Sequence, residues 1–129
     1  MKLVFKVLLG FFAVLVILGA VMWISLTSKM KEIQEESLGQ IDFSMYEDGT
    51  YEGLYYFENQ IGAKVEVLIE DGRLEDIILL EHVYGLGGKA ESIIDSVIAE
   101  QSLNVDYVSG ATTSSKVILL VIENAMEGN

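Results

Sequence analysis

The residues best suited to chemistry form a short run of hydroxyl-bearing side chains near the C-terminal end of the sequence. The stretch from Asp106 to Ser115 reads DYVSGATTSS and precedes an apolar segment that we predict to be a helix. The first amides of a helix have no internal acceptors, and with the helix dipole they can hold a phosphate group. Gly110 lets the backbone approach such a group closely, and Ala111 keeps that approach open. A threonine hydroxyl in this setting could become a phosphoester.

The alternative for these hydroxyl groups is purely structural. Serine and threonine are favoured N-cap residues, because their side-chain oxygens accept bonds from the first amides of a helix. For an isolated Ser109–Thr112 sequence (SGAT), a cap with surplus hydroxyls is the more common situation. The wider sequence has to decide between the two.

Three predicted strands precede this run. Aromatic and β-branched residues dominate Thr50 to Phe57, and Lys64 to Glu70 alternates apolar and polar side chains. Asp71-Gly72 follows at once, which is a strong hairpin signal, and Arg73 to His82 is the return strand. Because Ile77 to Leu80 is an uninterrupted apolar run, we predict that this return strand is central and buried on both faces.

Two predicted helices cover the sheet. Between Lys89 and Glu100 the apolar residues fall on one helical face. The second helix is predicted from about Ser114 to Met126, with serine and threonine residues as its caps. Its Val117–Ile122 stretch is apolar throughout and is compatible with a buried strand as well. The predicted fold class is α+β: a small antiparallel sheet of about three strands covered by two helices and preceded by one N-terminal transmembrane helix.

The N-terminal segment has the length of a membrane span. Val7 to Leu26 contains twenty residues and no ionisable side chain. A helix of that length rises about 30 Å, the thickness of a bilayer hydrocarbon core. A cleaved signal peptide is the alternative, but its apolar region is usually shorter, and no small-x-small site precedes Thr27. We predict three parts: a membrane anchor (1–27), a polar stalk without chemistry (28–47) and a domain (48–129).

The orientation in the membrane depends on the flanking cations. Lys2 and Lys6 precede the span, and Lys29 and Lys31 follow it, so the count is nearly balanced. A short basic N-terminus usually stays in the cytoplasm. We therefore predict a single-pass protein of the cytoplasmic membrane with its C-terminal domain on the extracytoplasmic side.

The sequence beyond the apolar segment is strongly acidic. From Thr27 onward it has six basic and twenty acidic residues, a formal charge of −14. Such a surface repels phosphate backbones, which excludes nucleic acid as a partner, and it attracts cationic patches. The sequence has no cysteine and one histidine, so we predict no disulfide, thiol chemistry or metal site.

The order D-x-x-S-G-A-T, from Asp106 to Thr112, resembles the flavinylation motif of the FMN-binding domain family. That family includes the FMN-carrying C subunit of the sodium-translocating NADH:quinone reductase and the G subunit of the Rnf complex. The resemblance extends from about Asp48 to Met126. It includes an opening strand at Asp48–Tyr51, the hairpin, and the glycine turn and helix from Gly85 to Ala90.

The resemblance implies a covalent cofactor. It implies that Thr112 is joined to the FMN phosphate by a phosphodiester, which a separate Mg²⁺-dependent flavin transferase installs from FAD with release of AMP. Asp106, Ser109, Gly110 and Ala111 would form the recognition sequence for that transferase. Thr113, which follows the acceptor, is expected among the residues around the phosphate. A covalent bond suits an extracytoplasmic domain, where a lost cofactor could not be replaced.

The flavin ring is expected near the end of the third strand. His82 is either a hydrogen-bond donor to the flavin or its phosphate, or a structural histidine bonded to a backbone carbonyl. Tyr84 and Leu86 are expected to pack on the ring, next to Gly87 of the glycine turn. Family members often carry an insertion after the histidine, whereas here two residues separate His82 from Gly85. This shorter loop changes how the ring would be covered.

The glycine turn also matches a relaxed dinucleotide fingerprint, Gly85-x-Gly87-x-x-Ala90. The strands before it form an antiparallel hairpin, and the soluble part is too short for two mononucleotide-binding halves. A nicotinamide site is therefore excluded.

The function that follows is an electron carrier between a membrane-associated donor and acceptor. The flavin would supply the redox chemistry, so the domain would turn over no substrate of its own. Two alternatives remain open. One is a reductase with non-covalent FMN, and the other is a flavin-free adaptor whose acidic face binds a basic partner.

Overall fold

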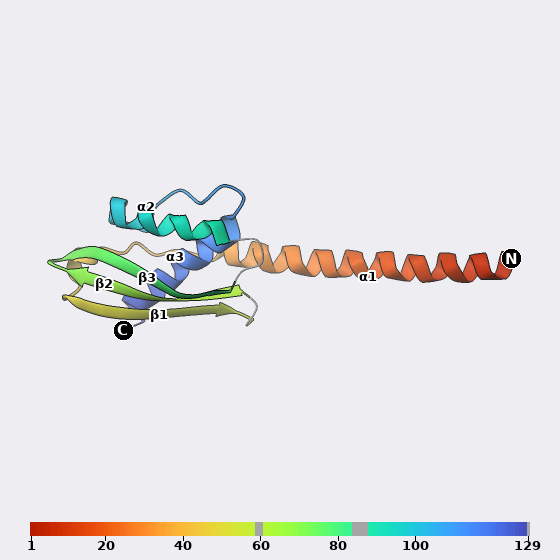
Figure 1. The fold of residues 1–129 in the computed structure, drawn as a ribbon, viewed down its shortest axis with the longest axis horizontal. Coiled ribbons are helices and arrows are strands. Elements are labelled where there is room, and N and C mark those ends of the chain that lie inside the picture. The colour runs from red at the N-terminus through yellow and green to blue at the C-terminus, as the bar shows by residue number, and fades with distance from the viewer. Residues whose placement is uncertain (59–60, 84–87, 129) are drawn as a thin grey trace. The chain divides into compact units, whose positions relative to one another are not determined.

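The computed structural model describes residues 1–58, 61–83 and 88–128. The chain divides into two compact units, Met1–Glu32 and Ile33–Asn129. The ribbon of both units is drawn in Figure 1.

The first unit is a single helix. It belongs to α1 (Lys2–Glu35), which is 34 residues long and is the one helix of the described residues that is long and apolar enough to cross a membrane. Its large apolar side chains, among them Phe12, Ile17 and Trp23, are exposed. Exposed apolar surface of this extent requires a lipid or protein cover. A signal sequence near an N-terminus has the same properties.

The second unit is built on a three-stranded antiparallel sheet, as predicted. Its strands are β1 (Gly49–Phe57), β2 (Ile61–Glu70) and β3 (Arg73–Val83), which lie in the order β1-β2-β3 (Figure 1). Asp71 and Gly72 connect β2 to β3 with φ angles of 51° and 69°. Two residues in the left-handed region match the right-handed twist of a tight hairpin, so the Asp-Gly prediction is confirmed.

The prediction that the third strand is central is wrong. β2 lies in the middle of the sheet, and its Val65, Val67 and Ile69 are fully buried. β3 is an edge strand on which Ile78 and Leu80 are 49% and 46% exposed. Successive side chains of a strand point to opposite faces of the sheet, so an apolar run puts apolar side chains on both faces. The run alone does not show whether both of these faces are covered.

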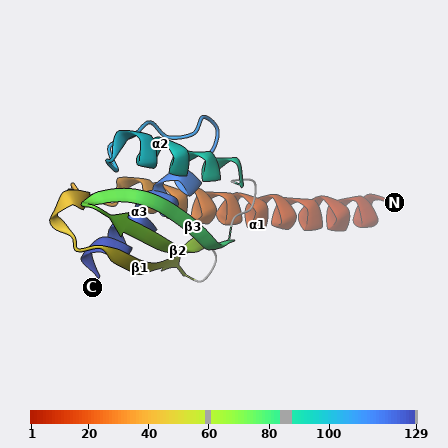
Figure 2. The same cartoon turned by 60° about the vertical axis from the view of Figure 1, so that its left-hand side comes forward.

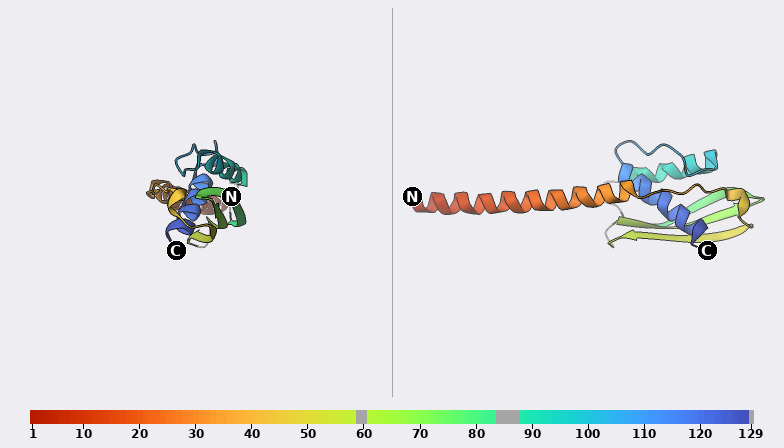
Figure 3. Two further views of the ribbon diagram at one scale, coloured as in Figure 1. Left: turned by 90° about the vertical axis from the view of Figure 1, so that its left-hand side faces the viewer. Right: turned by 180° about the vertical axis from the view of Figure 1, so that it is seen from behind.

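The helices pack against different strands of the sheet. A 3-10 turn, η2 (Gly88–Ser92), leads into α2 (Ile93–Glu100), which contacts β3. The C-terminal helix, α3 (Thr112–Glu127), crosses one face of the sheet and contacts β1 and β2 (Figures 2 and 3). The two predicted helices are therefore confirmed, although a 3-10 turn opens the first and the second begins two residues early.

The apolar run of α3 is explained by its surroundings. Every residue from Val117 to Ile122 is at most 4% exposed. A helix that is apolar all round has to be covered all round. The sheet covers one side, and the segment that begins at Ile33 supplies further cover: Ile33, Ile41 and Phe43 lie in the same core.

Residues 33–47 are tied to the C-terminal helix by polar contacts as well. The Gly39 amide donates a hydrogen bond to the Glu123 carboxylate. Asp42 caps the short 3-10 helix η1 (Phe43–Met45) by accepting from the amide and hydroxyl of Ser44 at 3.0 and 2.6 Å. These bonds favour the carboxylate and hold the pKa of Asp42 below its ordinary value. The last turn of α1 and the segment after it therefore form part of the second unit.

Candidate functional site

The start of α3 lacks a side-chain cap. Its N-cap residue is Ala111, and no side chain bonds to the first amides. The prediction that serine or threonine caps this helix is therefore wrong. The Ser115 amide makes the first helical bond, to the Ala111 carbonyl at 2.9 Å. Within the described part of the chain, the amides of Thr112, Thr113 and Ser114 have no acceptor, as expected for a helix start.

The hydroxyl groups of the motif have separate roles. Thr113 is 7% exposed, and its Oγ1 accepts a hydrogen bond from Gln34 Nε2 at 2.7 Å. Ser115 is fully buried, and its Oγ accepts from the Val108 amide at 3.0 Å. Thr112, by contrast, is exposed at the first position of the helix. The Ser115 hydroxyl therefore holds the turn and the Thr113 hydroxyl joins the helix start to Gln34, whereas Thr112 is exposed.

The turn before α3 depends on Gly110. Its φ is 75°, in the left-handed region that favours glycine, and the Ala111 amide donates to the Val108 carbonyl across the turn at 2.9 Å. Ser109 and Gly110 are exposed, and Ala111 is 6% exposed. The predicted recognition residues therefore include an exposed pair followed by a buried alanine that starts the helix.

A positive charge lies beside this turn. A Cβ placed on Gly110 would stand 2.6 Å from Lys89 Nζ and 3.4 Å from Lys89 Cε. The first turn of α3 carries no acidic residue, although the chain has twenty. The surroundings of Thr112 are thus more positive than the rest of this acidic domain.

An open groove runs along the approach to the motif. It has a volume of about 930 Å³ and is lined by residues 38–42 on one side and by residues 102–107 on the other. Asp106, the first residue of the motif, lines it and is exposed. The neighbouring Tyr107 is 39% exposed and is an aromatic side chain available to a ligand there.

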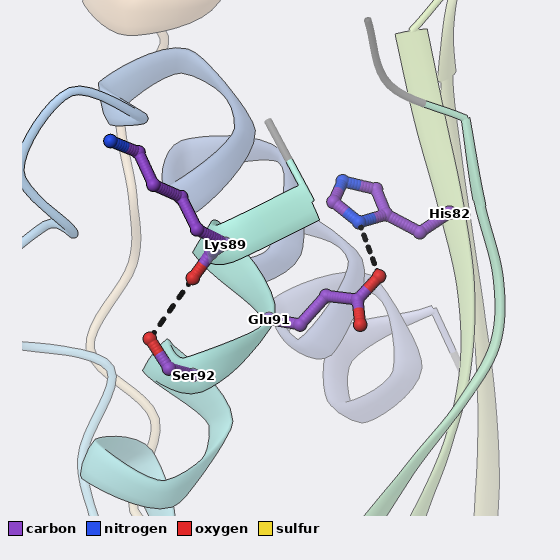
Figure 4. Close-up of polar contacts among 4 residues, drawn as sticks. All are labelled: His82, Lys89, Glu91 and Ser92. Carbon is purple, nitrogen blue, oxygen red and sulfur yellow. Dashed lines mark hydrogen bonds and ion pairs between the residues drawn. The ribbon is translucent and has the colours of Figure 1, made fainter. Parts of the chain in front are cut away.

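His82 lies on β3 with its side chain 2% exposed. Its Nδ1 is 3.2 Å from Glu91 Oε1, so the imidazole and the carboxylate join the end of the sheet to η2 (Figure 4). This contact is to a carboxylate, whereas the structural alternative considered above was a backbone carbonyl. The three other residues expected near the ring, Tyr84, Leu86 and Gly87, lie outside the described residues.

Two contacts of the site have no local signature in the sequence. Gln34 belongs to the region predicted as a stalk, yet it bonds to Thr113 across 79 positions of sequence. The sequence pattern indicates Lys89 only as the first residue of a helix, whereas in the structure its side chain on η2 approaches Gly110 in the turn before α3. The described residues contain no group of three histidine, aspartate or glutamate side chains that could hold a metal ion.

Comparison with known families identifies the second unit. The model of the FMN-binding domain matches residues 57–127, which is more than half of the chain. The match contains β2, β3, both helices that cover the sheet and the whole Asp106–Thr112 motif. Comparisons with curated proteins and with solved structures give no significant match. The chain therefore belongs to the FMN-binding domain family.

Proposed function

We propose that this protein is a membrane-anchored electron carrier that holds FMN through a phosphodiester on Thr112. Membership of the FMN-binding domain family supports FMN as the cofactor and electron transfer as the role. The observation that supports Thr112 as the covalent site is a difference in burial among the hydroxyl-bearing residues at the start of α3. Thr113 and Ser115 are buried and already accept hydrogen bonds, whereas Thr112 is exposed.

The surroundings of Thr112 fit a phosphate group. Uncapped amides and the positive end of the α3 dipole favour an anion at this position. The positive φ of Gly110 lets the backbone turn tightly in front of it. When bound, FMN would supply the redox chemistry, and the protein would fix its position and exclude competing reactions.

Attachment would proceed by transfer of a flavin phosphate from FAD. The Thr112 Oγ would attack the flavin-side phosphorus of the FAD pyrophosphate and form a new P–O bond. The bond from that phosphorus to the AMP phosphate would break, AMP would leave, and the hydroxyl proton would pass to the transferase or to solvent. No net oxidation or reduction occurs, and Mg²⁺ would neutralise the pyrophosphate.

The transferase or the flavin could contact the groove lined by residues 38–42 and 102–107. Asp106 and Tyr107 line it, and both precede the attachment site in the motif. The proposed recognition residues are therefore Asp106, Ser109, Gly110 and Ala111. His82 and the residues of the glycine turn (Tyr84, Leu86 and Gly87) complete the proposed surroundings of the cofactor.

The proposed localisation rests on α1. Residues 1–27 would anchor the chain in the cytoplasmic membrane, residues 28–32 would connect it to the second unit, and that unit, which begins at Ile33, would lie on the extracytoplasmic side. Length and apolar composition support a span, and Lys2 and Lys6 before it support a cytoplasmic location for that end of the helix. The proposed partners are a flavin transferase and a membrane-associated electron donor and acceptor, and the acidic surface favours basic patches on them.

Because the chain has no cysteine, single cysteines can report on the sidedness. We expect Glu75→Cys, on an exposed position of β3, to react with a membrane-impermeant maleimide added to intact spheroplasts. Lys2→Cys should react only after the membrane is permeabilised, because it would lie in the cytoplasm. The reverse labelling pattern would show that the domain faces the cytoplasm and would contradict the proposed localisation.

The covalent cofactor is tested by mass spectrometry. The full chain, co-expressed with a flavin transferase, should gain the mass of FMN less one water on the peptide that contains Thr112. After acid precipitation and denaturing electrophoresis the band should still fluoresce. Flavin released into the acid supernatant would indicate a non-covalent reductase instead. If neither fraction contained flavin, the protein would be a flavin-free acidic adaptor.

A further inference from the structure

The side chain of Lys89 lies against the turn that precedes Thr112. It leaves η2 on the side away from His82 and Glu91 (Figure 4). Its Nζ comes within 2.6 Å of the position that a Cβ on Gly110 would take. Gly110 stands two residues before Thr112, so an ammonium group lies next to the start of α3.

Lys89 is exposed, so water solvates its ammonium group, but without an anion the helix start offers this cation no attraction. The N-terminal end of a helix is its positive end and repels an ammonium group. Within the described residues Lys89 has no ion pair, although residues 33–129 contain nineteen carboxylates and only four basic side chains. Glu91, two positions away in the sequence, is engaged with His82. No cap side chain and no acid of the first turn offers a counter-charge.

A second cation lies one turn further along the same helix. Lys116 follows Thr112 by four positions, so the two residues share a helical face. Its side chain is 4% exposed, and it forms no ion pair with another described residue. Helical side chains lean toward the N-terminus of their helix, which in α3 is the end that carries Thr112. Two of the four basic residues of residues 33–129 therefore belong to this region: Lys89 beside the turn before α3, and Lys116 one helical turn after Thr112.

We propose that Lys89 is the side chain that binds the FMN phosphate on Thr112, with Lys116 as a second positive charge in the helix. This inference rests on the covalent FMN of the proposed function. The ammonium of Lys89 pairs with the phosphate oxygens together with the free amides of α3. The glycine at position 110 is required by its positive φ, and the end of the Lys89 side chain lies in the open space beside it.

The test compares flavin loading in three full-length variants in detergent with transferase, Mg²⁺ and limiting FAD. Lys89→Gln removes the charge, Lys89→Arg keeps it, and Lys64→Gln is the control for net charge. Lys64 pairs with Glu52 at 3.7 Å and alternates with the buried Val65, which places it on the other face of the sheet.

We expect Lys89→Gln to lower the initial rate of loading about tenfold at low salt, the usual size of one charge-assisted contact. Lys89→Arg should retain most of the wild-type loading rate. Added salt should reduce the difference in loading rate between Lys89→Gln and the wild type.

Thermal unfolding supplies a readout that does not depend on electron transfer. Without flavin, Lys89→Gln should melt at the wild-type temperature or slightly above it, because a repelled cation is removed. With flavin attached, it should melt about 4 °C below wild type, because the loaded form loses an ion pair. If Lys89→Gln and Lys64→Gln had the same initial rate of flavin loading and the same change in melting temperature on flavin attachment, the proposed role of Lys89 would be overturned. The proposal of covalent FMN would not be affected. A wild-type chain that takes up no flavin would overturn both proposals.

Discussion

Thr112→Ala is expected to remove covalent flavin completely while leaving the fold intact. The substitution deletes the one hydroxyl of the α3 start that is exposed and stands at the first helical position. An exposed substitution of this kind changes the free energy of unfolding by about 0.5 kcal/mol or less. After acid precipitation the variant should show no flavin fluorescence on a denaturing gel and no added mass, whereas its melting temperature should match that of the flavin-free wild type.

The matched control is the neighbouring Thr113→Val. Its hydroxyl is buried and accepts from Gln34 at 2.7 Å, so its loss leaves the Gln34 amide without this partner. Because Gln34 is exposed and can bond water instead, we expect a loss of about 0.5–1.5 kcal/mol in the free energy of unfolding, with flavin still attached. Fluorescence that persists in Thr112→Ala but disappears in Thr113→Val would move the attachment site to Thr113 and contradict the assignment.

Gly53→Ala is expected to lower the free energy of unfolding by about 3 kcal/mol, the upper end of the usual cost of overpacking. Gly53 lies on β1 where the strand approaches α3 most closely. An added Cβ would overlap the Val121 carbonyl oxygen and would stand 2.7 Å from the Ala125 Cβ. Both neighbours belong to the α3 helix, whose residues from Val117 to Ile122 are buried, so the helix has no free space in which to shift. The measurement is the midpoint of chemical unfolding of the full chain in detergent.

The control for this variant is Leu54→Ala, the next residue of the same strand. Leu54 is 54% exposed, so its truncation should change the free energy of unfolding by about 0.5 kcal/mol or less. If Gly53→Ala and Leu54→Ala had the same unfolding midpoint, β1 and α3 would not be in the close contact described here.

Local patterns in the sequence determined most of the secondary structure. The alternation of β2, the Asp71-Gly72 turn and the helical spacing from residue 89 to residue 100 depend on neighbours a few positions apart. The D-x-x-S-G-A-T motif is equally local, and together with the hairpin and the glycine turn it was sufficient to predict the family. Side-chain periodicity and turn geometry operate over this short range, which explains why these predictions were confirmed.

The tertiary structure decided what depends on contacts between distant segments. It left Ile78 and Leu80 of the edge strand β3 exposed, because cover of a strand's two faces depends on where distant helices pack. It separated Thr112 from Thr113, since the buried hydroxyl is the one that meets Gln34, 79 positions away. It also brought Lys89 to Gly110. A motif gives the order of its residues in the sequence. The burial and the charge around each of its side chains depend on residues from distant parts of the chain that pack against it.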